Sequence, residues 1–173
     1  MKYPIGIQTF DKIIKGGFVY VDKTGLVYQL AKGSVYFLGR PRRFGKSLLV
    51  STLEQYFLGN KEIFKGLAIE KLEKEWKQYP VFHIDFSTGN YLNDGTLEEV
   101  LSAYLDKWEK QYSITKKYRD LGLRFSEVLK VAHRQTGLGC VVLIDEYDKP
   151  ILDVLDLDIK VEHHGEKITL EEK

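Results

Sequence analysis

The sequence has one cysteine, Cys140, which excludes an internal disulfide framework and fits a reducing, cytoplasmic compartment. No apolar run approaches the roughly 20 residues that a membrane-spanning helix requires, and no apolar stretch of a signal peptide follows the first residues. The net charge is only +1, so no overall field draws the chain toward nucleic acid or a membrane. Repeats and low-complexity segments are also lacking. The 173 residues, of which 43% are apolar and 29% charged, are therefore expected to form one domain with a real core, with or without a small appendage.

Apolar runs and periodic stripes divide the chain into alternating strands and helices. Continuous apolar runs at 35–38, 81–86 and 140–144 predict strands buried on both faces, as in parallel sheets, and a short run at 18–21 predicts another strand. Helical spacing predicts helices that follow Thr24, follow Ser47, and cover 96–112 and 124–136. The sequence therefore predicts an α/β fold with a mostly parallel sheet and helices on both faces.

A candidate phosphate-binding loop follows the 35–38 run and precedes a helix, which is the context that such a loop requires. Its residues are Arg40, Pro41, Arg42, Arg43, Phe44, Gly45, Lys46, Ser47 and Leu48. In this interpretation backbone N–H groups hold an anion, Lys46 reaches the β- and γ-phosphates, and the Ser47 hydroxyl ligates Mg²⁺. Arg40 stands where the standard pattern has glycine. The alternative is an ordinary strand-loop-helix turn that contains Gly-Lys-Ser.

An acid pair, Asp145 and Glu146, follows the 140–144 run. Ligands of open α/β sheets bind beyond the carboxyl ends of the strands, and both motifs are expected there. We expect Asp145 to contribute to the magnesium shell and Glu146 to act as the general base that polarises a water. The alternative is a strand end capped by solvated acids.

Three strings of residues resemble the bacterial AAA-ATPase-like family. They are Tyr20-Val21-Asp22-Lys23-Thr24, Arg40-Pro41-Arg42-Arg43-Phe44-Gly45-Lys46-Ser47 and Leu143-Ile144-Asp145-Glu146-Tyr147-Asp148-Lys149-Pro150. The resemblance implies a P-loop NTPase that binds ATP and Mg²⁺, and it allows a residue other than glycine at Arg40. In that family the ATPase domain is often followed by a nuclease-like domain of the PD-(D/E)XK class, but this chain carries no nuclease motif.

The resemblance also implies a sheet order in which a fourth strand separates the strand at 35–38 from the strand at 140–144. Residues 1–155 are then the N-terminal part of an AAA-type domain, and 156–173 are a polar hairpin-like insertion or tail. The chain end is interpreted as a truncation before the fourth strand. The expected partners are ATP and the C-terminal region of the same protein, with oligomerisation left open and no membrane.

Other residues carry two interpretations each. The loop arginines contact nucleotide phosphates or, less favoured, nucleic acid. Asp22 lies near the base or ribose, or only forms a turn capped by Thr24. Asp85 joins the site at the strand ends, or caps its own strand.

Two functions remain at this point. The leading one is an ATPase that hydrolyses ATP when complete, which the presence of Glu146 favours. The other is a nucleotide-gated regulatory or binding module with negligible turnover, which the lack of a visible sensor residue and arginine finger favours.

Overall fold

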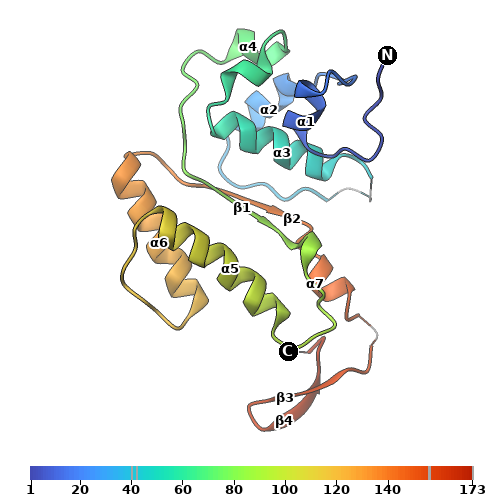
Figure 1. The fold of residues 1–173 in the computed structure, drawn as a ribbon, viewed down its shortest axis with the longest axis vertical. Coiled ribbons are helices and arrows are strands. Elements are labelled where there is room, and N and C mark those ends of the chain that lie inside the picture. Colours follow the sequence, from blue (N-terminus) through green and yellow to red (C-terminus); the bar gives the residue numbers. More distant parts are fainter. Residues whose placement is uncertain (40, 42, 156, 173) are drawn as a thin grey trace. The chain divides into compact units, whose positions relative to one another are not determined.

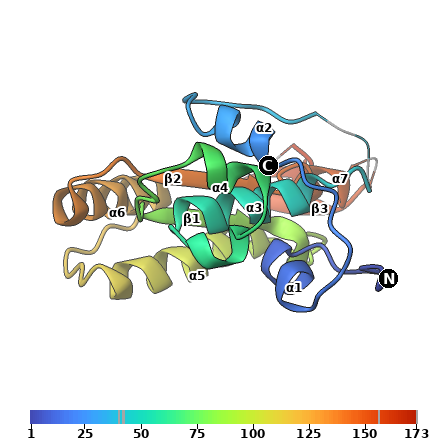
Figure 2. The ribbon, with the colours of Figure 1, turned by 90° about the horizontal axis from the view of Figure 1, so that it is seen from above.

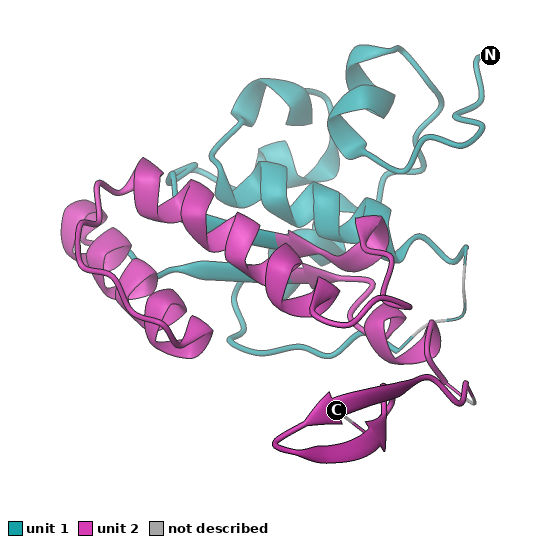
Figure 3. Cartoon of the chain, turned by 60° about the horizontal axis from the view of Figure 1, so that its bottom comes forward, with its two compact units in different colours: residues 1–83, 138–143 teal, residues 84–137, 144–173 magenta. Residues whose placement is uncertain are grey.

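The computed structural model describes residues 1–39, 41, 43–155 and 157–172 and divides the chain into two compact units (Figures 1 and 3). The first unit contains residues 1–83 and 138–143, and the second contains 84–137 and 144–173. The helices are α1 (Phe10–Lys15), α2 (Thr24–Leu30), α3 (Lys46–Phe57), α4 (Ala68–Leu72), α5 (Thr96–Gln111), α6 (Leu121–Thr136) and α7 (Lys149–Leu152), with 3₁₀ turns η1 (Lys61–Phe64) and η2 (Phe86–Thr88). The strands are β1 (Val81–Asp85), β2 (Val141–Asp145), β3 (Lys160–His163) and β4 (Glu166–Thr169).

The first unit is a small helical cluster in which α1 packs on α3 and α2 packs on α4. Its fully buried centre is formed by Phe10, Val27, Phe64 and Ile69. One face of α3 covers this centre, with apolar side chains at the helical spacing expected from the sequence. The prediction of a helix that follows the candidate loop is confirmed.

The second unit contains the two longest helices, α5 and α6, which run side by side (Figures 1 and 2). Their apolar stripes bury Leu105 and Trp108 against Val128 and Ala132. Helix α6 begins earlier than the sequence pattern suggests, because the Asp120 carboxylate accepts a hydrogen bond from an N–H group of its first turn.

Strands β1 and β2 form a two-stranded parallel sheet, and the N–H group of Val141 donates to the carbonyl oxygen of Pro80 at 2.9 Å. Both strands lie within one residue of their predicted positions. The predicted hairpin is also present, as an antiparallel β3–β4 pair with Lys160 opposite Thr169 and His163 opposite Glu166. The hairpin is a sheet of its own and adds no strand to β1 and β2. The fold is therefore a mixed α/β fold with a small parallel sheet.

Two predicted strands, 18–21 and 35–38, are wrong, because both segments are irregular. Val35, Tyr36 and Phe37 are 87%, 61% and 77% exposed, so this run is far from the buried position predicted for it. A strand needs a neighbouring strand to pair its backbone groups, and apolar composition alone does not supply one. In the part of the chain that the structure describes, neither run belongs to a sheet, and the extensive parallel sheet expected from the sequence is reduced to two strands.

Arg124 joins α5 to α6 through its guanidinium group. It donates to both carboxylate oxygens of Glu109 at 2.7 and 3.0 Å, to Asp106 at 2.5 Å and to the Ser102 hydroxyl at 2.9 Å. The hydrogen bonds to Glu109 are the main cause that raises the pKa of Arg124 above its ordinary value. Because the Arg124 and Glu109 side chains are only 11% and 16% exposed, the Glu109 carboxylate depends on Arg124 for compensation of its charge.

We expect Arg124→Met to lower the free energy of unfolding by about 2 kcal/mol, because it leaves the largely buried Glu109 carboxylate unpaired. Arg134→Met on the same helix is the matched control, since Arg134 is exposed and meets Glu127 at 3.5 Å, and it should change stability by less than about 0.5 kcal/mol. Urea unfolding followed by circular dichroism measures both. Equal effects of the two substitutions would show that the Arg124 network contributes nothing particular.

Candidate functional site

Helix α3 begins where the sequence places the phosphate loop. Gly45 is its N-cap residue, with φ +74°, and Lys46 is its first helical residue. A Cβ atom at Gly45 would meet nothing within 4 Å, so the glycine is needed for its left-handed backbone and not for lack of space. The Leu49 N–H group donates to the Gly45 carbonyl oxygen at 3.0 Å, which closes the first turn of the helix.

The first N–H groups of α3 have no partner inside the helix. Among the described residues no side chain caps them, and the side chains of Lys46 and Ser47 are partly exposed beside them. A helix end with open N–H groups, a positive dipole and an adjacent ammonium group is a suitable place for a phosphate. The residues present therefore fit the phosphates of a nucleotide.

The other loop residues divide into exposed and anchored ones. Pro41, Arg43 and Phe44 are exposed, and Arg43 has a left-handed φ of +66°. Leu48 packs against the buried centre of the first unit, so it holds the helix in place. The predicted positions Arg40 and Arg42 lie outside the described residues.

The acid pair lies in the second unit, at the end of β2. Asp145 is 7% exposed, and its carboxylate accepts a hydrogen bond from the Glu146 N–H group at 3.0 Å. No other hydrogen bond to this carboxylate comes from a described residue, which leaves acceptor positions for a ligand. Glu146 has a φ of +52°, a left-handed conformation that costs a non-glycine residue about 1 kcal/mol or more. A glycine at this position would avoid the cost. Glu146 therefore occupies a position whose backbone conformation disfavours its side chain.

Asp148 is a residue that the sequence interpretation did not assign to the site. Its Oδ1 atom is buried and, among the described residues, has no hydrogen-bond partner. A buried carboxylate oxygen without a donor costs free energy, and such atoms often meet a ligand or an ordered water. The one signal in the sequence was its spacing, three residues after Asp145 and directly before α7.

A magnesium site made by Ser47 and Asp145 remains a prediction, because Ser47 belongs to the first unit and Asp145 to the second. Within the described residues, no group of three or more histidine, cysteine or acidic side chains could hold a metal ion. Mg²⁺ in nucleotide sites is commonly held by one or two protein oxygens together with phosphate and water. The donor set of one hydroxyl and one carboxylate therefore fits that ion only in combination with a bound nucleotide.

The structure favours the second interpretation of Asp85, in which its carboxylate caps its own strand end. Both of its carboxylate oxygens are used within its own turn, by the Ser87 N–H group at 2.8 Å and the Ser87 hydroxyl at 2.9 Å. The hydroxyl of Tyr104 is also within hydrogen-bond distance of the Asp85 backbone. Asp85 is therefore a capped strand end.

Asp22 and Thr24 join the beginnings of α2 and α4. The Asp22 carboxylate accepts hydrogen bonds from the Thr24 N–H and hydroxyl groups at 2.8 and 2.7 Å and from the Ala68 N–H group at 2.7 Å. The Thr24 hydroxyl in turn accepts from the Ile69 N–H group at 3.1 Å. Burial raises the pKa of Asp22, but the hydrogen bonds from Thr24 and Ala68 outweigh it, so the net pKa is lowered. These contacts favour a capping role over contact with a base or ribose.

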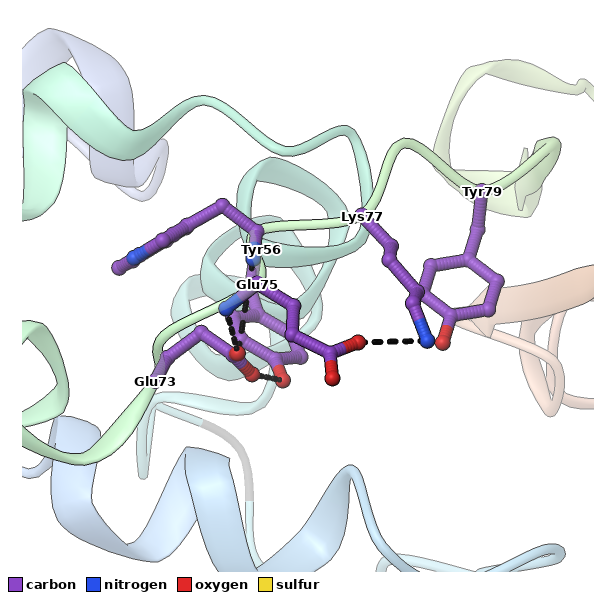
Figure 4. A pocket seen from close by; sticks show the side chains of 6 residues that line it. Tyr56, Glu73, Glu75, Lys77 and Tyr79 are labelled. Carbon is purple, nitrogen blue, oxygen red and sulfur yellow. Dashed lines mark hydrogen bonds and ion pairs between the residues drawn. The ribbon is translucent and has the colours of Figure 1, made fainter.

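The first unit also has a hollow of about 50 Å³, which is lined by Tyr56, Glu73, Lys77 and neighbouring residues (Figure 4). The Tyr56 hydroxyl donates to Glu73 at 2.5 Å. Burial, as the larger cause, and this hydrogen bond both raise the pKa of Tyr56. Tyr56 lies ten residues after Lys46 on α3, which is about 15 Å along the helix axis. The hollow is too small and too distant from Lys46 to hold the nucleotide.

A family model described as a predicted AAA-ATPase matches residues 4–169. The chain belongs to this AAA-ATPase-like family. The match covers both motifs of the candidate site and confirms the family resemblance drawn from the three strings of residues. A nuclease-like domain is not shown by this match.

One curated relative is an uncharacterized protein from the vnfD 5' region of Azotobacter chroococcum mcd 1. It is 45% identical over 156 residues, which cover 89% of this chain and 30% of the relative. The chain thus spans less than a third of that protein's length. No solved structure matches the chain. In the described part of the chain, none of the helices has the length and apolar character needed to cross a membrane.

The Asp22 cap predicts a pH-dependent stability. The pKa of Asp22 in the folded chain lies below its ordinary value of 3.8. Its stabilising contribution is therefore complete above that pH and is lost as the pH falls through the lowered pKa. We expect Asp22→Asn to reduce the free energy of unfolding by about 1 kcal/mol at pH 7, because the amide keeps only one acceptor oxygen.

Urea unfolding between pH 2.5 and pH 7 measures this effect, and the difference between Asp22→Asn and the wild type should shrink at the acidic end. Asp11→Asn is the matched control in the same unit, because Asp11 forms only an ion pair with the exposed Lys15 at 3.5 Å. A pH-independent difference would mean that the charge of Asp22 has no part in the cap.

Proposed function

We propose that the chain binds ATP at the loop of residues 40–48, together with Mg²⁺, and hydrolyses ATP when the ATPase domain is complete. The observation that supports this most strongly is the start of α3 at left-handed Gly45, inside a chain that belongs to the AAA-ATPase-like family. The family suggests the class of ligand, and the start of α3 supports the proposal that its phosphates bind there.

In this proposal the first unit binds the phosphates. The open N–H groups at the start of α3 donate to phosphate oxygens, and the Lys46 ammonium group neutralises their charge. The Ser47 hydroxyl is the metal ligand of this unit. Since Leu48 packs into the core, the binding groups are held on a rigid helix, which lowers the entropic cost of binding.

The second unit supplies the acids. Asp145 is the proposed residue of the magnesium shell, where Mg²⁺ would neutralise charge that develops on the phosphates. Glu146 is the proposed general base, which accepts a proton from the attacking water. The left-handed backbone of Glu146 supports this role, because strain of this kind is concentrated at functional sites. A module that binds nucleotide without turnover is the alternative, and turnover measurements separate the two.

Replacement of Lys46 tests the binding site. We expect Lys46→Ala to weaken binding of a fluorescent ATP analogue by about tenfold or more, because a charged hydrogen bond to phosphate is lost. The melting temperature should not change, since the Lys46 side chain lies on the surface of the first unit. Lys61→Ala, an exposed lysine of η1, is the control and should bind like the wild type. Undiminished binding by Lys46→Ala would refute the phosphate-loop assignment.

Replacement of Glu146 tests hydrolysis. In the full-length protein we expect Glu146→Gln to retain ATP with Mg²⁺ while steady-state phosphate release falls about a hundredfold or more, because the base is lost. Glutamine keeps the side-chain size and meets the same left-handed backbone, so the fold is not relieved of strain. Glu166→Gln in the hairpin is the control. Wild-type turnover in Glu146→Gln would exclude a catalytic role, and a wild-type protein that binds ATP without phosphate release would establish the gated module instead.

A further inference from the structure

The second unit has a pocket between the start of α5 and α7 that the nucleotide site does not use. It has a volume of about 100 Å³, well below the roughly 300 Å³ at which small-molecule and cofactor sites begin. Its apolar lining comes from Tyr91, Leu97, Pro150, Val154 and Leu170. The space suits a single side chain.

The floor of this α5–α7 pocket is buried and its polar group is hydrogen-bonded, whereas its rim exposes apolar side chains to solvent. Tyr91 and Val154 are each 4% exposed, and the Tyr91 hydroxyl donates to the Phe86 carbonyl oxygen at 3.1 Å, so the floor holds no unsatisfied hydroxyl. At the rim Leu97 is 39% exposed. Leu92 and Ile151, which follow the lining residues Tyr91 and Pro150, are 45% and 61% exposed. Leu97 therefore leaves apolar surface in water at the pocket, and exposed apolar surface at a concave site is typical of an interaction surface.

The two segments that supply most of the pocket lining, 84–99 and 144–158, are predominantly acidic. Every charged residue in 84–99 is acidic, and Lys149 is the one basic residue in 144–158. Lys149 is already paired with Asp153. Glu98 lines the pocket, and no described residue forms an ion pair with it. The rim therefore has a negative potential that is not balanced from within these segments.

We propose that the α5–α7 pocket binds a basic peptide segment of a partner protein, with one aliphatic side chain in the pocket and flanking lysine or arginine side chains on the acidic rim. The volume of the pocket admits one side chain, and its apolar lining favours an aliphatic one. The acidic rim favours positively charged residues on either side of it. Nucleic acid and anionic membranes are disfavoured occupants, because the same carboxylates would repel their phosphates.

A nuclear magnetic resonance titration tests the proposal on the whole chain. The probe is a blocked peptide with one leucine flanked on each side by two lysines. We expect its addition to shift the amide signals of Leu97, Glu98 and Val154. Replacement of the peptide leucine by alanine should weaken binding about tenfold or more, because most of the buried apolar surface is lost.

Two substitutions in the first turn of α5 distinguish binding in the pocket from a general attraction between opposite charges. Glu98 and Glu99 both lie in this turn and complement the helix dipole alike, but only Glu98 belongs to the pocket lining. Glu98→Gln should weaken binding about two- to fivefold, whereas Glu99→Gln should leave it nearly unchanged. Leu97→Ser should also weaken binding, and Leu123→Ser, at an exposed leucine of α6, should not.

Several outcomes would overturn the proposal. Equal affinity of the leucine and alanine peptides would show that charge alone attracts them. Equal effects of Glu98→Gln and Glu99→Gln would show that the peptide does not bind in the pocket. Shifts confined to residues outside the pocket, or equal binding of a peptide with glutamates in place of the lysines, would contradict it outright, as would binding of a short oligonucleotide at the same amides.

Discussion

The placement of α3 depends on one buried contact, that of Phe10. Its side chain is fully buried and its ring meets Tyr20 and Phe64 at centroid distances of 5.2 and 4.9 Å. Its N–H group, at the start of α1, donates to the Ser51 hydroxyl of α3 at 2.9 Å. Ser51 lies one turn beyond Ser47, so the interaction that completes α1 also orients the helix that begins at the candidate phosphate loop. Packing of the first unit and the orientation of α3 are thus determined together.

The sequence predicted the elements whose cause is local. The amphipathic stripes of α3, α5 and α6 are periodic, and helices of this length are stabilised by burial of such a stripe. The run at 35–38 is equally apolar, but a strand is stable only beside another strand, and composition does not say whether one is present. The early start of α6 had a local signal in Asp120, an N-cap residue that a pattern based on apolar spacing overlooks.

In the candidate site, too, the sequence predicted local features and missed those that depend on tertiary packing. A left-handed glycine before the first turn of a helix is a local feature, and the expected helix does begin at Lys46, directly after Gly45. The buried oxygen of Asp148 and the left-handed backbone of Glu146 arise from tertiary packing, and the spacing of Asp148 after Asp145 does not predict them. Asp85 shows the reverse case, because an acid at a strand end is used up by its own turn.

The run at 35–38 has a consequence for the proposed nucleotide site, because it leads directly into the loop. Val35, Tyr36 and Phe37 leave apolar surface in water, and each such side chain gains about 1.5–3 kcal/mol when it is fully buried. Any surface that covers this run also fixes the backbone that enters the loop. A loop already fixed loses less conformational entropy when phosphate binds, so the two events favour each other. In the proposed function, burial of residues 35–38 should therefore raise the affinity of the loop for nucleotide, even though none of their side chains needs to contact the phosphates.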